Sequence, residues 1–385
     1  MQPIDYVQHN EEVQQVWESY WAGQPIRVPM GNFTIGPRIW VLDPTLNTSG
    51  ITWEAFSTDP ELMFQTQLQY QYHLHHHVPH DIEMGVPTAG WEIFVEFCNI
   101  TEASWLGCQV VYPPGQVQAT RPAYQGERKN AIFDRGMPEP FDGVYTMVRE
   151  YYEYFLARAV DYDFYGKPVT IGLPNTGLGT DGPLTVALDV RGEEIFSDIY
   201  EDPDYYHQLM TFIVDATICK VQAWRAYLGI ESCPTGGWLA DDAIQLISTD
   251  TYREYVLPYH QRLLSTLYAA GPFGMHLCGN VQRHFPTLIS ELDIQHFDTG
   301  FPINFNTLRN EIGEEIHING GVHIDLLLHG SPAVVRAETQ RILASGVTRG
   351  GRFILKEANN MPPGVPELNL RTMYETVREL GRFHR

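Results

Sequence analysis

The sequence contains the stretch Gly271-Pro272-Phe273-Gly274-Met275-His276-Leu277-Cys278-Gly279-Asn280, a short apolar run closed by glycine and asparagine. This pattern predicts a buried strand that ends in a loop. Because side chains alternate along a strand, His276 and Cys278 project on the same side, two residues apart. An imidazole beside a thiolate supplies two of the ligands that zinc prefers in proteins. A metal site therefore needs at least one more ligand from elsewhere in the chain.

Short apolar segments alternate with amphipathic segments from about residue 160 onward. The apolar segments predict strands and the amphipathic segments predict helices, an order typical of a parallel sheet. The number of these units favours an α/β fold in which residues 141–385 close into a (β/α)₈ TIM-type barrel. The predicted strands lie at 169–173, 184–190, 237–242, 271–278, 294–298, 316–321 and 352–356, and the predicted helices at 203–228, 251–270, 281–292, 306–312, 332–344 and 369–383.

The first 140 residues have a different character, with many proline, glycine and aromatic residues. A helical period is sustained only over residues 60–77, and residues 91–95 and 109–112 read as strands between long loops. We expect residues 1–140 to form an N-terminal elaboration that packs on the barrel and covers its mouth. The chain would then form one structural domain overall.

The chain is strongly acidic, with a formal net charge of −22 over 385 residues. Nucleic acids and anionic membranes repel such a surface, which argues against both as partners. No apolar run approaches the roughly 20 residues that cross a bilayer, and residues 1–5 do not resemble a secretory signal. Five cysteines without close pairing are typical of a reducing compartment. The composition predicts a globular cytoplasmic protein and leaves its oligomeric state open.

Polar side chains follow most of the predicted strands, at the ends where barrel enzymes carry their active sites. Some of them are also typical helix caps or turn formers, and both interpretations stay open for Asp241, Asp242 and Asp298. The pair His276 and Cys278 favours a functional site more strongly. The strand-end residues are Asp241, Asp242, His276, Cys278, Asp298, His317, Asn319, His323, Glu357 and Asn359.

A histidine-rich segment, His73-Leu74-His75-His76-His77 with His80, lies at the end of the helix predicted over residues 60–77. Four of these histidines share one helical face, a spacing that can bind metal. Asp81 follows His80, but nothing else nearby confirms that use. We therefore interpret the segment as a polar helix face.

Several motifs occur in a fixed order along residues 140–385, and together they resemble the uroporphyrinogen decarboxylase superfamily. The segment at 102–108 is similar to that family's covering segment. The motifs are Gly182-Pro183-Leu184-Thr185-Val186-Ala187, Trp238-Leu239-Ala240-Asp241-Asp242-Ala243, His276-Leu277-Cys278-Gly279-Asn280, Asn319-Gly320-Gly321-Val322 and Gly350-Gly351-Arg352-Phe353-Ile354-Leu355.

The resemblance implies one of two chemistries. True decarboxylases of the superfamily carry an arginine-rich N-terminal segment that binds the carboxylates of the porphyrinogen, and no such stretch occurs here. The other branch contains zinc methyltransferases associated with corrinoid proteins, which bind zinc through a His-x-Cys pair and a later cysteine. Matching by position places His276 and Cys278 on the pair. This branch implies zinc as cofactor, a small-molecule substrate and a corrinoid protein as partner.

The chain departs from that pattern because the later cysteine falls on Asn359, a poor zinc ligand. Glu357 lies two residues earlier on the same predicted strand face, and its carboxylate is an acceptable ligand. A ligand set of His276, Cys278 and Glu357 is chemically harder than a set with two thiolates. A zinc ion held by such ligands is suited to act as a Lewis acid on an ether or hydroxyl oxygen. This favours removal of a methyl group from a substrate such as a methoxylated aromatic compound, hence an O-demethylase.

The first hypothesis is accordingly a zinc-dependent methyltransferase that moves a methyl group between a small substrate and a corrinoid protein or thiol. Asp241, Asp242 and Asp298 would be its catalytic residues, managing protons or orienting substrate. The second hypothesis is a metal-free decarboxylase or lyase with Asp241 and Asp298 at its polar centre. A third is a catalytically silent barrel, which the asparagine at position 359 favours.

Overall fold

A five-stranded parallel sheet forms more than half of the barrel wall, in the order β10-β9-β8-β7-β6. The computed structural model describes residues 4–31 and 36–383; residues 1–3, 32–35 and 384–385, which include part of the predicted cover, lie outside this description. The strands of the sheet are β6 (Thr235–Ala240), β7 (Ala270–Leu277), β8 (Ile294–Thr299), β9 (His317–His323) and β10 (Phe353–Ala358).

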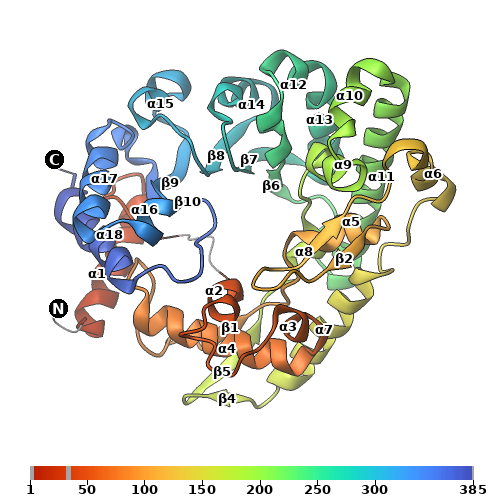
Figure 1. Cartoon of the computed structure of the whole chain (residues 1–385). Helices are drawn as coiled ribbons and strands as arrows, with labels where there is room; N and C mark the ends of the chain where they lie inside the picture. The colour runs from red at the N-terminus through yellow and green to blue at the C-terminus, as the bar shows by residue number, and fades with distance from the viewer. Residues whose placement is uncertain (1–3, 32–35, 384–385) are drawn as a thin grey trace.

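The rest of the wall comes from earlier segments of the chain. Strand β1 (Trp91–Ile93) pairs in parallel with β5 (Lys167–Ile171), which also pairs with the short antiparallel β4 (Asp163–Phe164). Residues 29–31 run along β10, because Leu355 N donates to Pro29 O at 2.9 Å and Gly31 N donates to Leu355 O at 3.1 Å. Figure 1 shows these segments arranged in a ring with the helices outside, which is the predicted TIM-type barrel.

Helices surround the strands, and local sequence signals set their bounds. In α11 the Asp202 side chain accepts a hydrogen bond from Tyr205 N, Pro203 occupies the first turn, and Gly229 ends the helix at φ +67°. The surrounding helices are α4 (Pro60–His77), α7 (Val144–Ala159), α11 (Pro203–Leu228), α12 (Thr249–Tyr255), α13 (Leu257–Leu267), α14 (Phe285–Leu292), α15 (Phe305–Ile312), α17 (Pro332–Ala344) and α18 (Glu367–Leu380). The sequence predicted the bounds of α4, α11 and α17 correctly.

The strand predicted at 184–190 is wrong. These residues belong to helix α9 (Pro183–Arg191), whose proline lies in the first turn. Its buried residues include Pro183, Val186, Ala187 and Val190, which follow the three- and four-residue spacing of a helix. A short apolar run satisfies the patterns of a buried strand and of a buried helix equally well.

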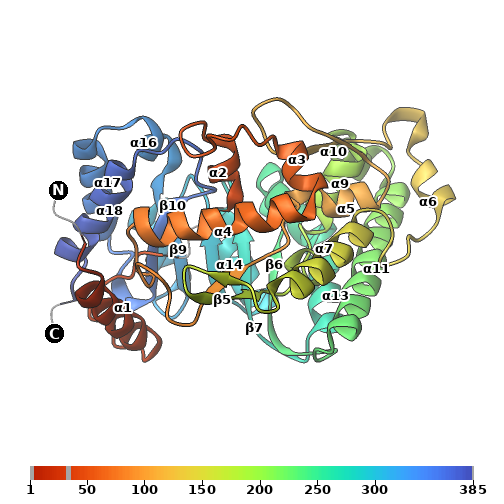
Figure 2. The ribbon, with the colours of Figure 1, turned by 90° about the horizontal axis from the view of Figure 1, so that it is seen from below.

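The expectation for residues 1–140 needs correction, since this part of the chain does more than cover the barrel. Residues 29–31 and β1 belong to the wall itself, and α4 packs against β1. Other N-terminal elements cover the mouth: Figure 2 shows α2 and α3 on the same side as α9, α10 and α16, opposite α1. The bounds of the remaining elements are α1 (Tyr6–Trp21), α2 (Pro37–Leu42), α3 (Trp53–Thr58), α5 (Thr101–Trp105), β2 (Gln109–Val111), β3 (Ala119–Arg121), α6 (Ala131–Arg135), α8 (Asn175–Leu178), α10 (Glu194–Glu201) and α16 (Ile324–His329).

None of the helices in the described part of the chain is both long enough and apolar enough to cross a membrane.

Candidate metal centre

The end of β7 brings His276 and Cys278 together. The Cys278 sulfur lies 3.3 Å from His276 Nε2, as their spacing of two residues predicted. Gly279 follows at φ +80°, and a Cβ atom there would come within 1.8 Å of Gln245 Oε1. The positive φ favours glycine at this position, and any other residue would also displace the Gln245 side chain.

A third donor comes from the neighbouring strand end. Asp242 follows β6 at the start of a short 3₁₀ helix, Asp242–Leu246, and its carboxylate accepts a hydrogen bond of 2.6 Å from Cys278 N. Ligand atoms of Asp242, His276 and Cys278 all lie within 4.8 Å of one another. Nitrogen, sulfur and oxygen donors thus converge at the mouth of the barrel.

Glu357, the predicted third ligand, does not belong to this cluster of Asp242, His276 and Cys278. Its carboxylate is fully buried, and Glu357 Oε1 lies 3.9 Å from Lys356 Nζ. Asn359 contacts the thiol instead, with its Oδ1 3.0 Å from the Cys278 sulfur. The sequence analysis expected Glu357 and Asn359 to project from the same face of one strand. This does not hold, because β10 ends at Ala358 and Asn359 has φ +121°, so the alternation of side chains no longer applies.

Asp298 fixes the orientation of the His276 ring. Parallel pairing of β7 with β8 places the two residues side by side, and Asp298 Oδ2 lies 2.6 Å from His276 Nδ1. Lys356, which is buried, donates a 2.7 Å hydrogen bond to the other oxygen of Asp298. With Nδ1 held in this way, Nε2 faces Cys278. The sequence analysis did not single out Lys356, although its place in a buried strand was a signal.

The charges of these groups are coupled. Burial by itself disfavours the imidazolium, but hydrogen bonds to Asp298 and Cys278 outweigh it and raise the pKa of His276 to about 10. Burial raises the pKa of the Cys278 thiol, and the hydrogen bond to His276 opposes this effect. Despite its burial, Asp298 has a lowered pKa because it accepts from His276 and faces Lys356.

The geometry fits zinc. Zinc–nitrogen and zinc–sulfur bonds at a tetrahedral angle place the two ligand atoms about 3.6 Å apart, close to the 3.3 Å between His276 Nε2 and the Cys278 sulfur. A carboxylate that holds the second nitrogen of a ligating histidine is a common feature of zinc sites. Asp298 holds the second ring nitrogen of His276, Nδ1, in this way.

Asp241, predicted as a catalytic residue, instead holds neighbouring parts of the fold together through hydrogen bonds. Its carboxylate is fully buried and accepts hydrogen bonds from His260 Nε2 at 2.9 Å, Leu184 N at 3.0 Å and Thr185 N at 2.8 Å. It also accepts from the Thr185 hydroxyl at 2.7 Å. These contacts tie the start of α9 to the end of β6 and leave little capacity for chemistry.

Three histidines of the histidine-rich segment, His73, His75 and His80, are buried, whereas His77 is exposed. His75 is buried with its Nδ1 2.5 Å from Glu83 O, and His80 is buried with its Nδ1 2.7 Å from Val78 O. His73 stacks on His77 with ring centroids 5.2 Å apart. The polar-face interpretation is thus wrong for the buried histidines.

Two cavities lie on the N-terminal side of the mouth. The larger, about 520 Å³, extends along α4 and reaches Glu96, Asn175 and Thr176. The smaller, about 260 Å³, shares those three residues and continues to Asp181. Burial, and then the charges of Glu102 and Asp242 among its neighbours, raise the pKa of Asp181 to about 7. Asp181, which lines the smaller cavity, is therefore close enough to Asp242 for the two carboxyl groups to interact.

The family model described as "Uroporphyrinogen decarboxylase (URO-D)" matches residues 167–380. The chain belongs to this family. A methylated-thiol–coenzyme M methyltransferase from Methanosarcina mazei is 30% identical over 202 residues, which cover 51% of each protein. A methylcobamide:CoM methyltransferase from the same organism is 21% identical over 202 residues, 51% of this chain and 56% of that protein.

A uroporphyrinogen decarboxylase from Syntrophotalea carbinolica is 28% identical over 184 residues, 47% of this chain and 51% of that protein. The alignments thus span about half the length of these relatives. A solved structure described as a methyltransferase from Methanosarcina mazei superposes with a TM-score of 0.64 at 17% identity, covering 95% of this chain and 98% of that one, which supports the barrel fold. The predicted family and fold are confirmed, whereas the relatives' names include both methyl transfer and decarboxylation.

Proposed function

We propose that this protein is a zinc-dependent methyltransferase whose metal ligands are His276, Cys278 and Asp242. The observation that carries the proposal is the convergence of these three donors, with Asp298 holding the far nitrogen of His276. Asp242 replaces Glu357 in the ligand set that the sequence suggested. Two methyltransferases among the relatives support the same reaction class.

Each residue around the ligands has a definite task. Asp298 keeps His276 Nε2 directed at the centre, and Lys356 keeps Asp298 ionised and in place. Asn359 contacts the Cys278 sulfur and limits its rotation. Bound zinc would supply Lewis acidity toward a thiol, ether or hydroxyl heteroatom of the substrate.

The transfer would take place between a small molecule and a corrinoid protein or a thiol. In the demethylating direction, the carbon–heteroatom bond of the substrate breaks and its electron pair stays on the heteroatom, which takes a proton. The methyl carbon bonds to the nucleophilic acceptor, either reduced corrinoid cobalt or a thiolate. A corrinoid protein remains a proposed partner, and the barrel mouth is where it would dock.

Decarboxylation is the weaker candidate. Its proposed polar centre required Asp241 and Asp298 in one site, but Asp241 caps α9 while Asp298 binds His276 and Lys356. In addition, only one arginine, Arg38, lines either of the two cavities among the described residues. A substrate with many carboxylates would need several such partners.

The test is the zinc content of protein purified without a histidine tag. We expect about one zinc per chain in the wild type and less than a tenth of that in Cys278→Ser, because serine does not ionise at neutral pH. Cys219→Ser is the matched control, since Cys219 is exposed and outside the centre. Equal zinc content in all three proteins, or none in the wild type, would contradict the proposal.

A further inference from the structure

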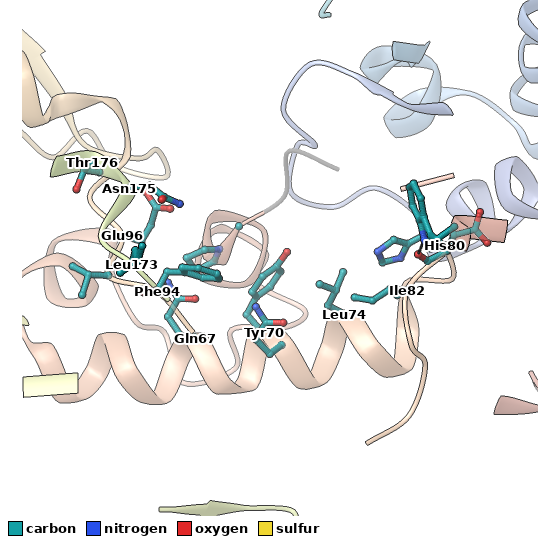
Figure 3. Close-up of a pocket in the computed structure, with 16 residues that line it drawn as sticks. Gln67, Tyr70, Leu74, His80, Ile82, Phe94, Glu96, Leu173, Asn175 and Thr176 are labelled. Carbon is teal, nitrogen blue, oxygen red and sulfur yellow. Dashed lines mark hydrogen bonds between the residues drawn. The ribbon is translucent and has the colours of Figure 1, made fainter. Parts of the chain in front are cut away.

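A third cavity lies between the N-terminal part of the chain and the loop that follows β10. This crevice is bounded by α2 and the residues just after it, by α4, and by the chain from residue 361 to the first turns of α18. Tyr70 projects from α4 beside the larger cavity (Figure 3) and also lines the crevice. The crevice has a volume of about 260 Å³. Since drug-sized ligands occupy cavities of about 300–1,000 Å³, its ligand is a smaller molecule.

Most of the crevice wall is apolar. It includes Ile39, Leu46, Val78, Met361, Val365 and Leu370. Removing apolar surface from water contributes about 25 cal/mol per Å² to binding, so this wall favours a ligand with an apolar body.

His73 lines the crevice from α4 without a hydrogen bond of its own. It is 8% exposed, and neither of its ring nitrogens has a hydrogen-bond partner in the described part of the chain. By contrast, Nδ1 of His75, of His76 and of His80 lies 2.5, 2.8 and 2.7 Å from a backbone carbonyl oxygen. The Tyr70 hydroxyl is wholly enclosed, whereas the ring nitrogens of His73 keep accessible surface. A ligand in the crevice can therefore reach them.

The His73 ring is neutral. Burial, and then the charge of His77, lower its pKa to about 4, although Asp43 opposes them. A neutral imidazole has one donor nitrogen and one acceptor nitrogen. Buried polar groups are nearly always paired, because an unpaired one has lost its bonds to water without replacement. The ligand thus offers a hydrogen-bonding group at His73.

Asp43 brings a carboxylate to the same crevice. It follows α2 directly, is 8% exposed and lines the crevice close enough to His73 to act on its charge. Its Oδ1 accepts hydrogen bonds from Thr45 N at 2.8 Å and from the Thr45 hydroxyl at 2.6 Å. Within the described residues, no cation pairs with Asp43 and no donor reaches its Oδ2. A buried carboxylate without a counter-charge is costly, and a cationic ligand would remove that cost.

The other charges around the crevice also favour a cation. Glu367 adds a second carboxylate at the rim, where its Oε1 lies 3.6 Å from His77 Nδ1. No lysine or arginine lines the crevice among residues 4–31 and 36–383. Arg38 of α2 lines the smaller cavity instead, and its charge is not among those that act on His73. An anion would therefore meet two carboxylates and no basic side chain.

We propose that this crevice binds an apolar primary amine in its ammonium form. The ammonium group donates hydrogen bonds to Asp43 Oδ2 and to the acceptor nitrogen of His73, and the apolar body packs against Ile39, Met361 and Leu370. A primary ammonium ion has three N–H donors and one positive charge, which matches these two acceptors and the one unpaired buried carboxylate. No step of the proposed methyl transfer uses this ligand.

The experiment is a calorimetric titration of the full chain with 2-phenylethylammonium as the probe and the neutral 2-phenylethanol, of equal size, as its comparison. We expect saturable binding of the ammonium ion, at least about tenfold tighter than that of the alcohol, since only the ion pairs with Asp43. Asp43→Asn should abolish this preference. His73→Phe should weaken ammonium binding about fivefold or more, because one acceptor is lost. Asp250→Asn is the matched control and should bind like the wild type, because that side chain is 98% exposed and outside the crevice.

No saturable binding to the wild type, equal affinity for the ammonium ion and the alcohol, or an unchanged preference in folded Asp43→Asn would each overturn the proposal. Circular dichroism spectra establish that the variants are folded. His73→Phe leaves the hydrogen bonds of Asp43 to Thr45 in place, so it tests the site even if Asp43→Asn does not fold, and wild-type affinity in His73→Phe would likewise refute it. His276→Ala lacks a proposed zinc ligand but keeps the crevice, so it should bind the ammonium ion like the wild type. Zinc binding and amine binding can therefore fail separately.

Discussion

The two sides of this barrel are built differently. Strands β6–β10 form one continuous hydrogen-bonded sheet, whereas the N-terminal side consists of the β1–β5 pair and the short segment at residues 29–31. The proposed metal centre lies on the continuous side, at the ends of β6, β7 and β10. The larger cavity lies on the other side, where α4 faces the interior. A fully paired sheet holds donor atoms in register, and an interrupted one leaves room for a ligand.

Each side also contains a buried lysine paired with a carboxylate. Lys356 binds Asp298 at 2.7 Å, and Lys220 binds Glu102 at 2.8 Å, with both lysine side chains at most 1% exposed. Because the two buried ion pairs are alike, matched substitutions of the two lysines can separate the functions of the two sides.

The largest expected effect is that of removing either lysine. Lys356→Met and Lys220→Met should each lower the free energy of unfolding by about 3–5 kcal/mol, because each leaves a buried carboxylate without its partner. Zinc affinity should fall by about 10- to 100-fold in Lys356→Met alone, since Asp298 orients His276. Denaturant unfolding and zinc titration against a chelating dye measure the two effects. Equal loss of zinc affinity in both variants would show that the two sides are not independent.

A smaller effect should distinguish the two candidate third ligands. Asp242→Asn should weaken zinc binding at least about tenfold, because the amide lacks the charge of a carboxylate ligand. Glu357→Gln should change it less than about threefold, since Glu357 stands outside the ligand cluster. The same zinc titration decides between them. The reverse ranking of the two variants would restore the ligand set suggested by the sequence.

The smallest effect concerns Asp189, on α9 at the N-terminal side. Burial, and then the charges of Glu102 and Asp241, raise the pKa of its carboxyl group to about 7. In the unfolded chain an aspartate titrates near pH ~4, so the folded protein binds this proton more tightly. Ionisation of Asp189 therefore costs stability progressively as the pH rises from about 4 to 7.

Asp189→Asn should consequently be more stable than the wild type at pH 8, by at least about 1 kcal/mol, with the difference vanishing near pH 4. Urea unfolding at both pH values is the measurement. Asp250→Asn is the control, because the Asp250 side chain is 98% exposed. A stability difference that is the same at both pH values would exclude titration of Asp189 as its cause.

Much of the architecture follows from local signals. A proline after an aspartate cap and a glycine after the last turn define α11, and Asp59 with Pro60 begins α4 in the same way. The positions of His276 and Cys278 follow equally directly, because strand alternation relates residues two apart. The strand predicted at 184–190 is wrong because a run of seven mostly apolar residues does not distinguish a buried helix from a buried strand.

The sequence by itself determined three features. The family follows from motifs in a fixed order along residues 140–385, the acidic character from composition, and the His276–Cys278 pair from residues two apart on one strand. Only the tertiary structure decided that Asp242 rather than Glu357 completes the cluster, that Asp241 caps α9 and that Lys356 supports Asp298. These relations join residues from different strand ends. They depend on the register between strands and on where each strand stops, and a shift of one residue would direct every side chain of a strand to its other face.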